Sequence, residues 1–142
     1  MVIANKDVAL FLLVGNDKIR DYLVNLLREH NYAPLVIADP GELVQALKGY
    51  QYATVFLDCE SVPLYGPGIY SKIKVACHYC RVVLLCDKSH KGHRDIIKEA
   101  MEIGIYACLL APFEGWEVLT MVRHSQAKKP AKKRLPKKKI IS

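Results

Sequence analysis

Residues 55–60 read VFLDCE, in which three apolar residues run directly into Asp58, Cys59 and Glu60. A strand that looks buried and ends on a carboxylate needs an explanation, because burying an unpaired charge is costly. Either Asp58 lies in solvent beyond the end of the strand, or it points into a site that uses a negative charge. The segments on either side of this stretch decide between the two.

Four further apolar runs accompany the one that ends at Asp58. The five runs are VALFLLV (8–14), PLVIA (34–38), ATVFLD (53–58), RVVLLC (81–86) and IYACLL (105–110). None of them alternates polar with apolar residues, and continuous apolar strands are typical of a parallel sheet covered on both faces.

Helical spacing fills the stretches between these runs, at residues 18–30, 40–49, 67–78, 92–103 and 114–125. Asp39 and Glu42 form a capping pattern around Pro40 at the start of the second helix, and Gly104 ends the fourth. The predicted inward faces consist of Ile19, Leu23, Leu26, Leu27 and His30; Leu43, Val44 and Leu47; Ile69, Ile73, Ala76 and Cys77; Ile96, Ile97, Ala100 and Met101; and Trp116, Leu119 and Val122.

Strand and helix therefore alternate five times along the chain. This order predicts an α/β fold with a five-stranded parallel sheet, strand order 2-1-3-4-5, in a doubly wound three-layer α/β/α sandwich. In such a sheet the ligand crevice lies at the carboxyl ends of strands 1 and 3. Asp58 ends the third predicted strand and GND (15–17) follows the first. We therefore expect Asp58 to point into the site.

The charge divides the chain into two parts. The net charge of the 142 residues is +7, but residues 127–142, AKKPAKKRLPKKKIIS, contain eight Lys or Arg and no acid. The 21 Lys and Arg less these eight leave 13 against 14 Asp and Glu, so the remainder is close to neutral. We expect one domain over residues 1–126 and a basic, disordered tail over residues 127–142.

The apolar runs and the cysteines indicate in which cellular compartment the protein is expected. The longest unbroken run, 8–15, is far shorter than the ~20 residues of a membrane span, and NDKIRDYL (16–23) after it has no signal-peptide cleavage site. We therefore expect a cytoplasmic protein without a membrane span. The five cysteines are odd in number and mostly occupy apolar runs, which predicts reduced, buried thiols.

Over about residues 7–126, the chain resembles the receiver domain of two-component response regulators, the CheY-like family. VFLDCE stands at the phosphoacceptor strand, IRDYLVNLLREHNY (19–32) resembles the first helix, and IGIYACLLAPF (103–113) resembles the ending Gly-acidic-aromatic-x-x-Lys-Pro-Phe. The resemblance implies a flavodoxin/CheY-like fold, a signalling role without enzymatic activity, and Asp58 as the phosphoacceptor.

The loop after the first strand departs from the family. There, two acidic residues hold Mg²⁺ together with the phosphoacceptor, because magnesium prefers hard oxygen ligands. This chain has Gly15, Asn16 and Asp17 in a loop that is one residue shorter, so Gly15 with Asn16, or Asn16 with Asp17, takes the place of the acidic pair. Asn16 and Asp17 are the candidate ligands if the site is active, with Glu60 as a further ligand. The competing interpretation is that Asp17 caps a helix beginning at Lys18.

Three further signature positions are changed. Cys86 replaces the Thr or Ser that hydrogen-bonds a phosphoryl oxygen, and a thiol is a weak donor. Ala111 replaces the Lys that pairs with the aspartate, and Cys108 replaces the switch aromatic. Tyr106 is expected on the same side of the strand as Cys108, either as its substitute or as a core residue. The resemblance also implies a cis bond before Pro112.

These replacements favour a degenerate receiver, or pseudo-receiver, that signals by binding a protein through the face made by residues 92–103, 105–110 and 114–125. A working phosphoacceptor at Asp58 is the alternative and implies a histidine kinase as partner and Mg²⁺ as cofactor. A homodimer is also compatible with the pattern. A third hypothesis is an accessory protein whose tail contacts nucleic acid or an acidic surface. The contact residues would be Lys128, Lys129, Lys132, Lys133, Arg134, Lys137, Lys138 and Lys139.

The sequence also contains a linear pattern that is typical of a zinc site. CHYC (77–80) and HKGH (90–93) together read Cys-x2-Cys…His-x2-His. The fold places the cysteines before the fourth strand and the histidines after it. A five-residue strand spans ~17 Å, whereas zinc–ligand bonds are about 2 Å long. One ion cannot bind all four side chains, so we expect buried cysteines and surface histidines.

Overall fold

The computed structural model describes residues 9–66, 68–87 and 89–127. Its five strands form one parallel sheet in the order β2-β1-β3-β4-β5. The strands are β1 (Leu10–Leu13), β2 (Leu35–Val36), β3 (Thr54–Asp58), β4 (Arg81–Asp87) and β5 (Ala107–Ala111). The helices are α1 (Asp17–Glu29), α2 (Pro40–Leu47), α3 (Val62–Tyr65), α4 (Ile69–Ala76), α5 (Lys91–Ile103) and α6 (Gly115–Ala127). The predicted fold class and strand order are confirmed.

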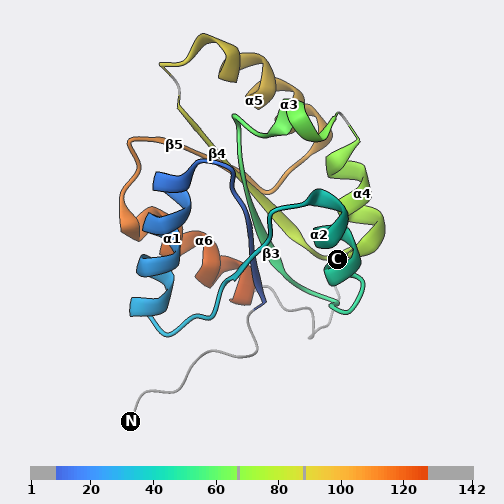
Figure 1. Ribbon diagram of the computed structural model, residues 1–142, viewed down its shortest axis with the longest axis vertical. Coiled ribbons are helices and arrows are strands. Elements are labelled where there is room, and N and C mark those ends of the chain that lie inside the picture. The colour runs from blue at the N-terminus through green and yellow to red at the C-terminus, as the bar shows by residue number, and fades with distance from the viewer. Residues whose placement is uncertain (1–8, 67, 88, 128–142) are drawn as a thin grey trace, which may run out of the picture.

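The sheet is the middle layer of three, as Figure 1 shows, with α1 and α6 on one face and α2 and α4 on the other. Alternate residues of β1, β3 and β4 pack on the two faces of the sheet. Leu12 packs in the cluster with the α1 and α6 side chains, and Phe11 in the cluster with α2, α4 and α5. Since all four residues of β1 are fully buried, its sequence has to be continuously apolar.

Helix ends follow the local sequence signals. Asp39 Oδ2 accepts a hydrogen bond from the backbone N–H of Glu42 at 3.0 Å, and Pro40 is the first residue of α2. Gly104 ends α5 in the left-handed conformation, with φ of 94°. A residue without a Cβ tolerates this conformation, so both predicted helix signals are confirmed.

Several local predictions were wrong. Helix α3 is only four residues long, so it has no apolar periodicity that sequence reasoning could detect. His30 caps the end of α1 and is exposed. Met101 and Trp116 were placed on inward faces, but they are 54% and 65% exposed. In α6 the buried stripe consists of Val118, Leu119 and Val122, and it continues to Gly115, where a Cβ would lie 3.2 Å from Leu26 Cδ1 of α1, so Trp116 lies beside the stripe.

The register brings three strand ends together at the carboxyl edge of the sheet. Leu57 of β3 pairs with Leu13 of β1, and Asp58 pairs with Leu85 of β4. Residues 14–17, 58–60 and 86–87 therefore meet at one edge. Among the described residues, no helix is long and apolar enough to cross a bilayer.

Candidate functional site

Asp58 is the buried carboxylate at this edge, with 1% of its surface exposed. Its Oδ1 accepts a hydrogen bond from the backbone N–H of Gly15 at 3.1 Å, and its Oδ2 accepts one from Asn16 at 3.2 Å. The loop after β1 thus closes over the carboxylate with its own amides. These bonds offset the cost of burying the charge, and the expectation that Asp58 points into the site holds.

Asn16, and not Asp17, caps the start of α1. Asn16 is the N-cap of α1, because its Oδ1 accepts from the backbone N–H of Ile19 at 3.0 Å, while its Nδ2 donates to Glu60 Oε2 at 3.4 Å. Asp17 is therefore not the cap. It is the first helical residue, and its carboxylate pairs with Arg20 at 2.9 Å on a side chain that is 79% exposed.

Gly15 leaves room for a buried hydroxyl. A Cβ at this position would collide with Ser61 Oγ and would lie 3.9 Å from Asp58 Oδ2. Ser61 is 5% exposed and stands at the start of α3. The hydroxyl therefore occupies the space that a side chain at position 15 would need.

Tyr65, the last residue of α3, lies near the same edge. Burial raises the pKa of its phenol, a hydrogen bond with Ser61 opposes that rise, and the carboxylates of Asp58 and Asp39 add to it. The phenol therefore stays protonated in this environment at neutral pH.

Two disulfides correct the expectation of reduced thiols. Cys59 is bonded to Cys86 with 5.1 Å between their Cα atoms, and Cys77 is bonded to Cys80 with 5.3 Å. Cys59 and Cys86 lie at adjacent ends of β3 and β4, where the backbone N–H of Cys59 donates to Leu85 at 2.9 Å. The two cysteines become neighbours through the register of β3 and β4, although they are 27 residues apart in sequence.

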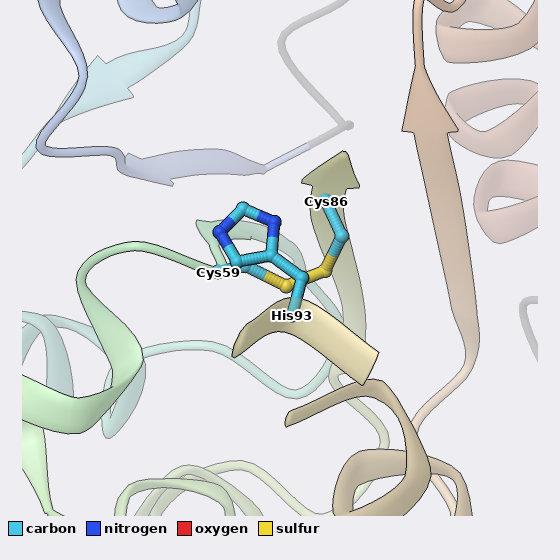
Figure 2. Close-up of side chains that lie close together, drawn as sticks. All are labelled: Cys59, Cys86 and His93. Atoms are coloured by element: carbon cyan, nitrogen blue, oxygen red, sulfur yellow. A yellow bond between two sulfur atoms is a disulfide. The ribbon is translucent and has the colours of Figure 1, made fainter. Parts of the chain in front are cut away.

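His93 joins this cysteine pair and is buried, contrary to the surface position expected for it. Its side chain is 5% exposed, and its Nδ1 accepts a hydrogen bond from the backbone N–H of Asp87 at 2.9 Å. A ring nitrogen of His93 and the sulfurs of Cys59 and Cys86 all lie within 4.8 Å of one another. Figure 2 shows the imidazole beside the disulfide.

Asp87, at the end of β4, carries a tight turn beside this cluster. Its Oδ1 accepts hydrogen bonds from the backbone N–H and the hydroxyl of Ser89, at 2.9 and 2.6 Å. These bonds lower the pKa of the Asp87 carboxyl, and the nearby His93 and His90 rings lower it slightly further.

No protein-family model matches the chain, and no curated protein matches its sequence significantly. Solved structures do match it. The receiver domain of a sensor histidine kinase from Pseudomonas aeruginosa, solved with magnesium in its active-site cleft, has a TM-score of 0.69 at 18% identity, covering 84% of this chain and 98% of its own. FixJ from B. japonicum has a TM-score of 0.70 at 21% identity, covering 87% and 60%. The chemotaxis protein CheY4 of Vibrio cholerae has 0.65 at 16%, covering 83% and 98%.

The chain has the fold of the response regulator receiver domain. At these identities the likeness concerns the fold, so the chemistry of the site has to be argued from the residues of this chain.

At the end of β5, the side chain expected from the receiver resemblance is replaced, but the expected backbone conformation is present. Ala111 is half-buried and pairs in register with Asp87, and the Ala111–Pro112 bond is cis, as expected. The position where the receiver resemblance implies a lysine thus ends at a methyl group.

Cys108 and Tyr106 do not share a side of the sheet. Cys108 packs in the cluster of α2, α4 and α5, and its Sγ lies 4.0 Å from Met101 Sδ. Burial raises the pKa of its free thiol. Tyr106 packs in the opposite cluster, with the Arg81 guanidinium 4.3 Å from its ring centre. Tyr106 precedes β5, where the regular alternation of side chains begins, so the expectation that it shares a side with Cys108 is wrong. Of its two expected roles, the packing supports that of a core residue.

The side chains at this edge do not fit the magnesium site of a receiver. Both Asp58 oxygens accept backbone N–H groups, Asn16 Oδ1 caps α1, Asp17 faces Arg20, and Gly15 has no side chain. In the described part of the chain, the group of three donor side chains within reach of one ion is the Cys59, Cys86 and His93 cluster, whose sulfurs are soft ligands. Asn16 and Asp17 as magnesium ligands remain a prediction that would require both side chains to turn.

The cysteines and the histidines of the Cys-x2-Cys…His-x2-His pattern lie at opposite ends of β4, as expected. Cys77 and Cys80 precede β4, and His90 and His93 follow its other end. The His90 and His93 rings stack with centres 4.2 Å apart.

The tail residues predicted to contact nucleic acid, Lys128, Lys129, Lys132, Lys133, Arg134, Lys137, Lys138 and Lys139, lie outside the described residues. Their role remains a prediction.

Sequence reasoning missed His93 although a signal was present. Counting from His93, Ile96, Ile97 and Ala100 lie three, four and seven residues further along, which is the spacing of one helix face. Ser61 gave no comparable signal, because its importance depends on the absence of a Cβ at Gly15.

Proposed function

We propose that the chain is a receiver-like signalling module of the two-component type in which phosphoacceptor chemistry has degenerated and which acts by binding a protein. The observation that carries this proposal is the environment of Asp58. Its oxygens are bound by the protein's own amides, and the position that would supply a cation is Ala111.

A phosphoryl group carries about two negative charges at neutral pH, which the site would have to stabilise. Removing one preorganised charge-stabilising donor costs about 3 kcal/mol in a transition state. Here the lysine is absent from position 111, and the sulfur of Cys86 is bonded to Cys59 instead of offering a donor. Transfer to Asp58 and readout of the phosphoryl group should both be impaired.

Incubation of the full chain with acetyl phosphate and Mg²⁺, followed by intact mass measurement, tests the degenerate assignment. We expect no adduct of about 80 Da above that of an Asp58→Asn control. An adduct that forms on the natural chain and disappears in Asp58→Asn would instead support the alternative, a working phosphoacceptor. Mg²⁺ is included because the Pseudomonas receiver domain was solved with it.

The docking face proposed for the partner consists of α5, β5 and α6. Each element leaves a large apolar side chain exposed: Ile103 is 49%, Leu110 40% and Trp116 65% exposed. Trp is one of the residue types that supply most of the affinity of protein interfaces, so Trp116 is the principal anchor that we assign to this face.

Paired surface variants test this face. Leu110→Ser combined with Trp116→Ala should abolish capture of a specific partner, or self-association if that partner is a second copy. Leu64→Ser combined with Val75→Ser is the matched control, because these side chains are 82% and 88% exposed on α3 and α4. Equal loss of binding in both double variants would contradict the assignment.

A further inference from the structure

The cluster of Cys59, Cys86 and His93 lies beside Asp58 without belonging to the expected receiver chemistry. All three side chains are at least 95% buried, since 0%, 3% and 5% of their surfaces are exposed. The sulfurs come from the ends of two neighbouring strands, and the imidazole is brought over them by the first turns of α5 (Figure 2).

The hydrogen bond to His93 defines which ring nitrogen carries the proton. Because Nδ1 accepts from the backbone N–H of Asp87, the neutral ring must be protonated on Nε2. Nε2 is buried and has no hydrogen-bond partner among the residues that the structure describes. A buried donor without an acceptor is costly, so this N–H favours any state of the cluster that provides a better acceptor.

The same hydrogen bond argues against a metal ion. An imidazole binds metal through a nitrogen lone pair, but here the Nδ1 lone pair accepts from Asp87 and Nε2 carries the proton. Metal binding would leave the Asp87 N–H without its acceptor. A sulfur beside the ring requires no lone pair of the imidazole, and one ring nitrogen lies within 4.8 Å of both sulfurs.

We propose that Cys59 and Cys86 form a site of reversible oxidation, a dithiol that a hydroperoxide oxidises and an external dithiol reduces, with His93 as a supporting hydrogen-bond donor. Cys86 is the member that retains slight exposure, so we assign it as the thiolate that meets the oxidant.

The Cys86 thiolate attacks the O–O bond of the hydroperoxide, which forms a sulfenic acid and releases an alkoxide that takes up a proton to become an alcohol, or water when the oxidant is hydrogen peroxide. The Cys59 sulfur then attacks the Cys86 sulfur. The S–S bond forms, the S–O bond breaks, and the hydroxyl leaves as water with the Cys59 proton. Reduction transfers two electrons and two protons from the external dithiol, which becomes a disulfide.

Cys108 provides an internal comparison. Its thiol is half-buried and free, and burial raises its pKa, which lowers the fraction present as thiolate. The Cys59 and Cys86 sulfurs are bonded to each other, whereas Cys108 is free. A sulfenic acid on Cys86 therefore has a neighbouring cysteine that converts it to a disulfide, and a sulfenic acid on Cys108 does not.

The experiment uses the full chain, reduced with dithiothreitol, desalted in the presence of a chelator and exposed to hydrogen peroxide. Free thiols are blocked with N-ethylmaleimide at each time, and peptides are mapped by mass. We expect the Cys59–Cys86 linked peptides to appear while Cys108 is still alkylated. A Cys77→Ser, Cys80→Ser variant is the matched control for the second disulfide and should form the Cys59–Cys86 bond at an unchanged rate.

Variants separate the individual roles. In Cys59→Ser, Cys86 should accumulate as a sulfenic acid that dimedone captures, whereas Cys86→Ser should give little capture at Cys59. His93→Leu should slow oxidation, because the ring nitrogen beside the two sulfurs is lost. His93→Gln keeps one donor and one acceptor and should retain most of the rate.

Three results would overturn the proposal. The first is oxidation of Cys108 while Cys59 and Cys86 remain alkylated. The second is one equivalent of Zn²⁺ bound by the reduced chain and lost in His93→Leu, which would make the cluster a metal site. The third is equal oxidation rates for His93→Leu, His93→Gln and the natural chain, which would remove His93 from the mechanism. Since the readout does not require phosphorylation of Asp58, its failure is distinct from failure of the proposed function.

Discussion

At the scale of single residues, the packing at the carboxyl edge of the sheet requires that Gly15 has no side chain. Gly15 donates its backbone N–H to Asp58 while the space beside its Cα is taken by the Ser61 hydroxyl. A carboxylate side chain at position 15, which one register of the receiver resemblance implies, would have to displace that hydroxyl. The loss of the acidic pair and the burial of Ser61 are thus two aspects of one packing arrangement.

A double-mutant cycle tests this arrangement. Gly15→Ala should lower the free energy of unfolding by about 1–3 kcal/mol, the usual cost of overpacking a filled site. In a Ser61→Ala background the same substitution should cost less than about 1 kcal/mol, because the colliding oxygen is gone and the Ser61 Cβ lies 3.7 Å from the new methyl group. Urea denaturation measures all four proteins. Additive effects of the two substitutions would show that they do not share this space.

The Asp87 turn provides a test by pH. Hydrogen bonds from Ser89 hold the pKa of the Asp87 carboxyl below its ordinary value of 3.8. Because the folded-state pKa is depressed, the stabilisation is fully present above pH 3.8 and is lost as the pH falls through the folded pKa. Ser89→Ala removes the hydroxyl donor and should raise the pKa, as followed by the NMR shift of the carboxyl carbon. The exposed Ser71→Ala on α4 is the control, and an unchanged titration in Ser89→Ala would contradict the assignment.

At the scale of elements, the start of α1 is determined one residue earlier than the sequence indicated. Both Asn16 and Asp17 suit an N-cap, and local sequence does not distinguish them. The choice is made by tertiary structure, since the Asn16 backbone N–H is held by Asp58 and its side-chain amide also reaches Glu60. Helix α1 is thereby joined to the end of β3.

Paired alanine substitutions should reveal this difference. Asn16→Ala should cost about 1–2 kcal/mol of unfolding free energy, because the cap is lost. Asp17→Ala should cost less than about 1 kcal/mol, because its ion pair with Arg20 is at the surface. Urea unfolding of the two variants provides the comparison, and a larger loss in Asp17→Ala would restore the capping role first expected for it.

The five strands and the principal helices could be predicted because their signals are local. Apolar runs marked the strands, and the alternation with amphipathic segments determined the sheet order. The predicted strand order also placed Asp58 beside residues 15–17, because the carboxyl ends of strands 1 and 3 are neighbours in such a sheet. The Cys59–Cys86 pair could not be found in this way, because its members become neighbours only through the register of β3 and β4. The exposure of Trp116 was equally hidden, because the buried face of α6 runs through Gly115, Val118 and Val122, and a glycine gives no apolar signal.

At the scale of the whole molecule, the charge distribution separates a nearly neutral domain from a basic tail. Residues 127–142 carry eight Lys or Arg and no acid. Such a segment binds polyanions by releasing counterions, with no requirement for a particular base sequence.

Salt titration tests whether the tail binds nucleic acid. If all eight cations contact duplex DNA, the slope of log affinity against log salt should be about −7. Fluorescence anisotropy with two unrelated duplexes should give equal affinities for the full chain and no binding for a chain ending at residue 127. Binding that survives this truncation would assign the contact to the folded domain.

The bond between Cys59 and Cys86 also determines how the molecule would respond to force. It closes a loop across a sequence separation of 27 residues, and the Cys77–Cys80 bond lies inside that loop. A pull on both ends of the oxidised chain cannot extend the enclosed segment, which at ~3.3–3.6 Å per residue hides roughly 90 Å of contour length. In optical tweezers the reduced protein should therefore lengthen on unfolding by that additional amount relative to the oxidised protein.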